Sequence, residues 1–208
     1  MTRPEGQSRE LAVRLEELGH EVVLCPLVRI EPLGDEPVDV TGYDWVIVTS
    51  ANGADELARR MRGRPVRVAA VGPATAAALA RHGLDADLVA RTSTQEGLLA
   101  ELPRPAGRVL VAAAEGARRL LVDELDADFV ALYRTVELRP DEPPEGDLVV
   151  LASGSAARAF AALGVDLPAV TIGPQTTATA HECGIRVAAE AETHDLDGLV
   201  RAVARLAP

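Results

Sequence analysis

The sequence predicts an α/β protein whose parallel sheets are covered by helices on both faces. Strand-like and helix-like segments alternate along all 208 residues. The strand-like segments are continuous apolar runs, which is typical of strands buried on both faces of a parallel sheet. Hydrophobic residues make up 48% of the chain and aromatic residues only 2%. We therefore expect a sizeable packed core built mainly from Ala, Val and Leu.

The first half of the chain opens with a helical pattern. Leu11, Leu15 and Leu18 share one face of it, and a glycine follows its last turn. Ser50 or Asn52 can cap a later helix. The expected elements are helices at 7–18, 53–62 and 74–81 and one ending near 102, strands at 21–30, 44–50, 66–71 and 86–90, and a polar linker at 31–40.

The second half repeats this alternation. A proline-rich stretch at 139–146 predicts a second linker, and Tyr133 lies near the end of the strand before it. A run of arginines from Arg59 to Arg67 is interpreted as a solvated face. The expected elements are strands at 108–113, 129–138, 148–152, 170–172 and 185–189, helices at 117–125, 156–163 and 196–206, and one helix that follows the second Gly-Pro turn.

An internal repeat indicates that the α/β unit is duplicated. Its members recur in the same order: TSANGADEL at 49–57 and ASGSAARAF at 152–160, VGPAT at 71–75 and IGPQT at 172–176, Thr92 with Gly97 and Thr193 with Gly198, and Glu5-Gly6 with Arg9 and Leu11 against Glu115-Gly116 with Arg119 and Leu121. The repeated turns follow strands, and ligands of open parallel sheets bind beyond the carboxyl ends of strands. Helix N-termini at these turns suit carboxylates or phosphates. If the two sets of turns face each other, they line one cleft.

Composition excludes several classes of function. The formal net charge is −11, so nucleic acid is not an expected partner. All basic residues are arginine, which rules out a P-loop lysine and a Schiff-base lysine. Cys25 and Cys183 form no CxxC pair, so we expect ordinary thiols in a reducing cytoplasm. His181 and Cys183 lie two positions apart, which is not the spacing of a metal-ligand pair on a helix, so we expect no metal. No apolar run has the length of a membrane span.

The hydroxyl residues at the repeated turns leave two interpretations open. Thr75, Thr176, Thr177, Ser153 and Ser155 can satisfy helix ends or bind a ligand. Tyr133 is one of two tyrosines, and it is either an amphipathic interface residue or a functional phenol.

The ordered set of motifs resembles the uroporphyrinogen-III synthase family over essentially the whole chain. The motifs are TRP at 2–4, TSANG at 49–53, VGPAT at 71–75, YRTVEL at 133–138, ASGSA at 152–156 and IGPQTT at 172–177. The resemblance implies two flavodoxin-like domains, interleaved in sequence and joined by a two-stranded linker. One domain comprises 39–135, the other comprises 1–34 plus 139–208, and the linkers are 35–38 and 136–138.

The resemblance also implies the reaction. Hydroxymethylbilane, a linear tetrapyrrole with eight carboxylates, loses its terminal hydroxyl as water and closes to uroporphyrinogen III with ring D inverted, without a cofactor. Tyr133 matches the family's tyrosine, which assists departure of the hydroxyl. A cytoplasmic monomer that binds no membrane is expected. The implied substrate-binding residues are Arg3, Thr49, Ser50, Asn52, Gly72, Thr75, Ser153, Ser155, Gly173, Thr176 and Thr177, and Arg91 and Arg134 are further candidates for local positive charge.

Two alternatives stay open at this point. Besides a synthase, the first is a non-catalytic two-lobed module that binds an anionic small molecule. The second is a regulatory fragment descended from such a synthase. Family members usually carry an apolar strand before the TRP motif, whereas here Met1 stands at that motif. We expect a strand of this kind to be central to its sheet, and a translation start upstream of Met1 is the favoured explanation.

Overall fold

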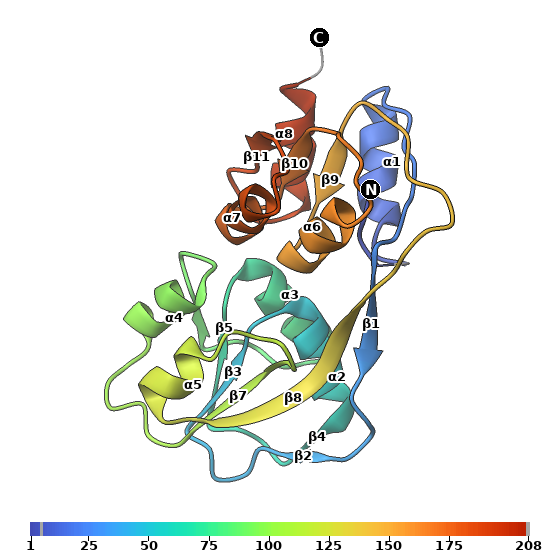
Figure 1. The fold of residues 1–208 in the computed structure, drawn as a ribbon. Coiled ribbons are helices and arrows are strands. Elements are labelled where there is room, and N and C mark those ends of the chain that lie inside the picture. The colour runs from blue at the N-terminus through green and yellow to red at the C-terminus, as the bar shows by residue number, and fades with distance from the viewer. Residues whose placement is uncertain (5, 207–208) are drawn as a thin grey trace. The chain divides into compact units, whose positions relative to one another are not determined.

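The fold is taken from a computed structural model, which describes residues 1–4 and 6–206 (Figure 1). Glu5, part of one repeat pair, and residues 207–208 lie outside the described residues. Helices and strands alternate along the chain, as the sequence predicts. The chain divides into two compact units. The central unit is Ile30–Arg134, and the terminal unit combines Met1–Arg29 with the chain from Thr135 onward.

The central unit is a parallel sheet with helices on both faces (Figure 1). Its elements are β3 (Trp45–Val48), α2 (Ala51–Arg60), β5 (Arg67–Ala70), α3 (Pro73–Arg81), β6 (Leu88–Val89), α4 (Gln95–Glu101), β7 (Val109–Ala114), α5 (Leu120–Leu125) and the first part of β8 (Asp128–Glu137). The strand order is β8-β7-β3-β5-β6, and every neighbouring pair is parallel. All of β3 is buried because it pairs on both edges and is covered on both faces.

Alternation along β3 divides the core of the central unit into two layers. Val46 and Val48 join a cluster that includes Leu57 of α2 and Leu79 of α3. Ile47, which points to the opposite face, joins a cluster with side chains of α4 and α5. A continuous apolar run is therefore required, because each successive side chain enters one core or the other.

The terminal unit has the same construction on a smaller scale. Its elements are α1 (Arg9–Glu17), β9 (Val149–Leu151), α6 (Gly154–Ala161), β10 (Ala169–Thr171), α7 (Pro174–Glu182), β11 (Val187–Glu190) and α8 (Leu196–Ala204). The strand order is β11-β10-β9, again parallel. Phe160 of α6 packs on one face with Leu151, and Leu11 of α1 packs on the other with Val150.

The chain crosses between the units within two strands. Strand β1 (Val28–Pro32) neighbours β8 in the sheet, and the divisions at Arg29/Ile30 and Arg134/Thr135 fall inside β1 and β8. The polar stretch 31–40 is more structured than a linker, because it contains the end of β1 and the short strand β2 (Val38–Asp39). Strand β2 pairs in parallel with β4 (Met61–Arg62).

The predicted strand at 21–30 is wrong over its first seven residues, because β1 begins only at Val28. Residues 21–27 make backbone hydrogen bonds with the short segment of Met1 and Thr2. The Cys25 N–H donates to the Met1 carbonyl at 2.9 Å, and the Leu27 N–H donates to the Thr2 carbonyl at 3.3 Å. The Leu27 carbonyl in turn accepts the Leu138 N–H at 2.8 Å, so the bonds of this segment go to separate parts of the chain, whereas a strand needs one neighbour that continues the ladder.

The interpretation of the arginine run as a solvated face is wrong at Arg60. This residue is only 8% exposed. Its guanidinium donates to the carbonyls of Glu36 at 2.8 Å and Leu33 at 3.0 Å. These carbonyls belong to the loop between β1 and β2, and the planar guanidinium with its five N–H groups supplies the donors they require.

Candidate functional site

In the central unit, the predicted site residues gather at one edge of the sheet. Thr49 and Ser50 follow β3 directly, and Gly72 follows β5 as the cap of α3. Because β3 and β5 are parallel, their carboxyl ends meet at the same edge. Asn52 lies in the first turn of α2. The helix N-termini there present backbone N–H groups to whatever binds at this edge.

Tyr133 of β8 reaches this edge through a hydrogen bond with Ser50. The phenol oxygen lies 2.8 Å from Ser50 Oγ, and Tyr133 is only 6% exposed. Ser50 Oγ also accepts the Gly53 N–H at 3.0 Å as the cap of α2. The Asn52 side chain is a further hydrogen-bond partner of the phenol. The helix cap therefore fixes the position of the tyrosine hydroxyl.

The surroundings of Tyr133 keep its phenol protonated. Burial raises its pKa above the ordinary value of 10.0, and the hydrogen bonds with Ser50 and Asn52 offset part of this effect. A neutral hydroxyl can donate a hydrogen bond or a proton to an oxygen leaving group near neutral pH. The arrangement therefore suits a general acid.

Both units contain a Gly-Pro turn at the start of a helix. A Cβ at Gly72 would lie 2.4 Å from Ser93 Oγ, and a Cβ at Gly173 would lie 2.7 Å from His194 Cδ2. Glycine is required at both turns because another side chain sits directly against the backbone. Thr75, in the first turn of α3, is 4% exposed.

Ser93 and His194 are therefore candidate site residues that the residue-by-residue interpretation missed. Each follows the repeated threonine, Thr92 or Thr193, by one position. The repeat contained the signal, because Ser93 stands to Gly72 as His194 stands to Gly173.

In the terminal unit, the predicted hydroxyls lie after β9 and β10. Ser153 Oγ caps α6 by accepting the Ala156 N–H at 3.2 Å, and Ser155 Oγ lies 3.1 Å from it. Thr176 is 4% exposed. Thr177 Oγ1 lies 2.6 Å from Thr171 Oγ1 and donates to the Glu190 carboxylate. Ser153, Ser155 and Thr177 are thus partly exposed, whereas Thr176 is buried.

The candidate arginines differ in how their charge is compensated. Arg134 pairs with Glu31 at 2.8 Å and Arg91 with Glu101 at 3.2 Å. Arg3 has a pKa lowered by burial, and its buried Nε has no hydrogen-bond partner among the described residues. Among these three arginines, Arg3 is therefore the one with a buried donor that no described residue accepts from.

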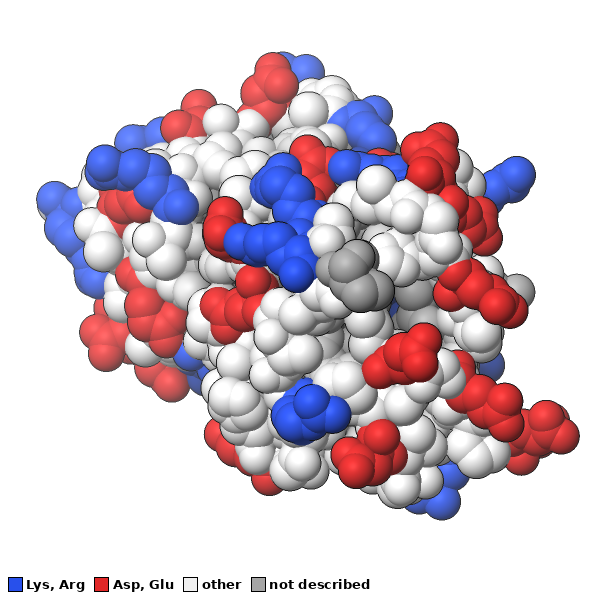
Figure 2. Space-filling view, turned by 90° about the horizontal axis from the view of Figure 1, so that it is seen from above, with Lys and Arg blue, Asp and Glu red and all other residues white. Residues whose placement is uncertain are grey.

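Charges of both signs are interspersed on the surface shown in Figure 2. Acidic and basic side chains lie next to one another on the face seen in Figure 2, although the net charge is −11. Within residues 1–4 and 6–206, no group of three His, Cys, Asp or Glu side chains could hold a metal ion. The same part of the chain has no helix long and apolar enough to cross a membrane.

The fold and this edge define a parallel α/β protein that presents capped helix N-termini and a buried phenol at the carboxyl ends of its strands. A family model described as "Uroporphyrinogen-III synthase HemD" matches residues 9–201. The chain belongs to the uroporphyrinogen-III synthase family, hydro-lyases of porphyrin biosynthesis.

Individual relatives agree with this assignment. The chain is 30% identical over 243 residues to the uroporphyrinogen-III synthase of Synechococcus elongatus, covering 97% of this chain and 92% of the relative. It is 26% identical over 147 residues to a putative uroporphyrinogen-III synthase of Methanocaldococcus jannaschii, covering 66% and 61%. The fold resembles the crystal structure of a mutant Thermus thermophilus uroporphyrinogen III synthase, with a TM-score of 0.62, 18% identity and coverage of 96% and 94%.

Proposed function

We propose that the chain cyclises hydroxymethylbilane to uroporphyrinogen III, with inversion of ring D and loss of water. The observation that carries this proposal, beyond family membership, is the Tyr133 phenol held 2.8 Å from Ser50 at the start of α2. A protonated phenol fixed at the ligand-binding edge of a parallel sheet is suited to assist departure of a hydroxyl as water.

We propose that the hydroxyls and helix N-termini bind the substrate's carboxylates. A predicted site residue is the N-cap of each of α2, α3, α6 and α7, and a helix N-terminus carries unpaired N–H groups with partial positive charge. This local field suits a polyanion even though the protein is acidic overall. Arg3, with its unused Nε donor, adds a full positive charge.

We also propose two interleaved flavodoxin-like domains, 39–135 and 1–34 plus 139–208, joined at 35–38 and 136–138. The division into compact units supports this organisation, since its two breaks fall at Arg29/Ile30 and Arg134/Thr135. The free thiols of Cys25 and Cys183 suit a reducing cytoplasm. We propose a monomer, which sedimentation at working concentration tests.

The activity is tested by incubating the protein with freshly generated hydroxymethylbilane and separating the uroporphyrinogen isomers. Excess type III isomer over the protein-free control is expected. The type I isomer alone would overturn the proposal. Saturable binding of the substrate without turnover would instead favour a non-catalytic module that binds an anionic small molecule.

A further inference from the structure

His194 lies at the carboxyl edge of the sheet in the terminal unit. Strands β9, β10 and β11 are parallel, so the segments that follow them meet at one edge. Ser153 lies after β9, Gly173 lies after β10, and His194 lies in the segment between β11 and α8. The histidine therefore belongs to the same edge as the hydroxyls that we propose to bind the substrate.

The imidazole of His194 rests against the backbone of Gly173. A Cβ at Gly173 would lie 2.7 Å from Cδ2 and 3.1 Å from Nε2 of the ring, so the edge of the ring that carries Nε2 lies at the Gly-Pro turn. The side chain is half-buried. Within the part of the chain that the structure describes, neither ring nitrogen has a hydrogen-bond partner. An imidazole has an N–H donor in either neutral tautomer, so this ring can bind a ligand.

The segment that carries His194 is anchored on both sides of this residue. Thr193 Oγ1 donates to the Asp195 carboxylate at 2.8 Å and accepts from Arg201 at 2.7 Å. Asp195 also caps α8 by accepting the Gly198 N–H at 2.7 Å. The backbone of His194 is therefore held between two bonded neighbours, while its ring nitrogens stay available.

Several groups at the first turn of α7 are already used. Pro174 has no N–H, and the N–H groups of Thr176 and Thr177 both donate to the Gly173 carbonyl at 3.0 Å. The Thr177 hydroxyl donates to the Glu190 carboxylate, and Thr176 is only 4% exposed. An anion bound at this turn gains little from these groups, and His194 is placed to supply a further donor.

We propose that His194 is a substrate-binding residue, whose imidazole donates a hydrogen bond to one carboxylate of the linear tetrapyrrole at the first turn of α7. This inference rests on the proposed function. Ser93 holds the matching place against Gly72 in the central unit and also carries a donor. The bond is made with a peripheral carboxylate and not with the reacting carbon, so it contributes to binding and not to the chemical step.

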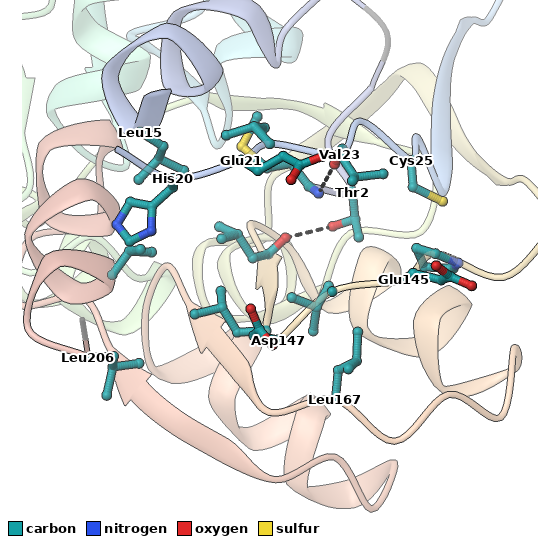
Figure 3. Close-up of a pocket in the computed structure, with 18 residues that line it drawn as sticks. Thr2, Leu15, His20, Glu21, Val23, Cys25, Glu145, Asp147, Leu167 and Leu206 are labelled. Carbon is teal, nitrogen blue, oxygen red and sulfur yellow. Dashed lines mark hydrogen bonds between the residues drawn. The ribbon is translucent and has the colours of Figure 1, made fainter. Parts of the chain in front are cut away.

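A second half-buried histidine of the terminal unit provides a matched control. His20 lines a cavity of about 500 Å³ (Figure 3). Leu148, directly before β9, and Leu167, before β10, line the same cavity, so it lies toward the amino ends of these strands. His20 is therefore at the opposite end of the sheet from His194.

Isomer-resolved kinetics with freshly generated hydroxymethylbilane tests the proposal. His194→Phe keeps a flat ring and removes both nitrogens. It should raise KM by about tenfold or more and leave kcat within roughly twofold, because a hydrogen bond to a charged group is lost from substrate and transition state alike. His194→Gln keeps an N–H group and should restore most of the affinity. His20→Phe should behave as the native protein.

Binding is measured separately by titrating the protein with uroporphyrinogen III under exclusion of oxygen. The loss of water leaves the eight carboxylates of the substrate in this product. The imidazole resonances of the four histidines report the contact. The resonances that are missing in His194→Phe should shift during the titration, and those that are missing in His20→Phe should not.

The outcomes separate this inference from the proposed function. An unchanged KM in His194→Phe, with the type III isomer still formed, would overturn the inference and leave the proposed function intact. A lower kcat at unchanged KM would also overturn it, and so would a His194→Gln variant as poor as His194→Phe with an equally lowered midpoint of thermal unfolding. If the native protein forms no type III isomer, the proposed function fails. Shifted His194 resonances would then still support the inference, and unshifted ones would overturn it.

Discussion

The phenol oxygen of Tyr133 lies 2.8 Å from Ser50 Oγ, although the two residues are 83 positions apart in the sequence. Ser50 caps α2 with the same oxygen. The cap and the strand that bears the tyrosine are therefore connected through one hydroxyl, which ties the orientation of the proposed general acid to the start of a helix.

Tyr133→Phe should slow formation of the type III isomer by about 100-fold without abolishing it, since a positioned general acid contributes roughly 10²–10⁴-fold. Isomer-resolved kinetics measures this effect. Tyr43→Phe is the control, because Tyr43 donates to Asp128 away from the site residues. An unchanged rate in Tyr133→Phe would remove the phenol from the mechanism.

Ser50→Ala should raise the pKa of Tyr133 further above 10, because the hydrogen bond with Ser50 lowers it. In a Tyr43→Phe background Tyr133 is the only tyrosine, so ultraviolet titration reports on it alone. Ser153→Ala removes a matched helix cap in the terminal unit and should leave the titration unchanged. Each variant should lose about 1 kcal/mol of stability with its cap.

Gly97→Ala should destabilise the protein by about 1–3 kcal/mol, although alanine is the better helix former. A Cβ at Gly97 would lie 2.2 Å from the Thr92 carbonyl oxygen, which is backbone and cannot move aside easily. Urea unfolding measures the loss. Gly116→Ala, where a Cβ meets open space, should cost little. Equal effects at the two positions would contradict this interpretation of the close approach.

Arg60→Met should lower the free energy of unfolding by roughly 2–3 kcal/mol, since hydrogen bonds from a charged donor to the Leu33 and Glu36 carbonyls are lost. Arg64→Met, at an exposed position, is the matched control and should be nearly neutral. A neutral Arg60→Met would mean that water replaces the guanidinium without cost.

Glu96→Gln should make the free energy of unfolding fall less steeply as the pH is lowered. The hydrogen bonds from Arg118 lower the pKa of Glu96 from 4.5 to about 2. This pair therefore stabilises the fold fully above about pH 4.5, and its contribution disappears as the pH falls to about 2. The pair is half exposed, so its contribution at pH 7 should stay below about 1 kcal/mol.

Urea unfolding at pH 7, 4 and 2.5 measures this pH dependence. The difference between the native protein and Glu96→Gln should shrink toward pH 2.5, and Arg118→Gln should show the same trend. A difference that stays constant with pH would assign the effect to packing.

The sequence by itself determined the alternation of elements and the starts of several helices. Ser50 was a predicted cap, and its side chain does cap α2. The repeat located the Gly-Pro turns that begin α3 and α7. These features depend on groups within a few residues of one another, since helix periodicity and capping bonds span at most about four positions.

Only the tertiary structure decided which distant groups meet. It brought Tyr133 to Ser50, buried Arg60 under loop carbonyls, and set Ser93 and His194 against glycines. It also confined the strand predicted at 21–30 to its last residues, because β1 begins only at Val28. Strand formation and side-chain burial depend on which chains become neighbours, and no local pattern specifies neighbours that lie 20 to 150 positions away.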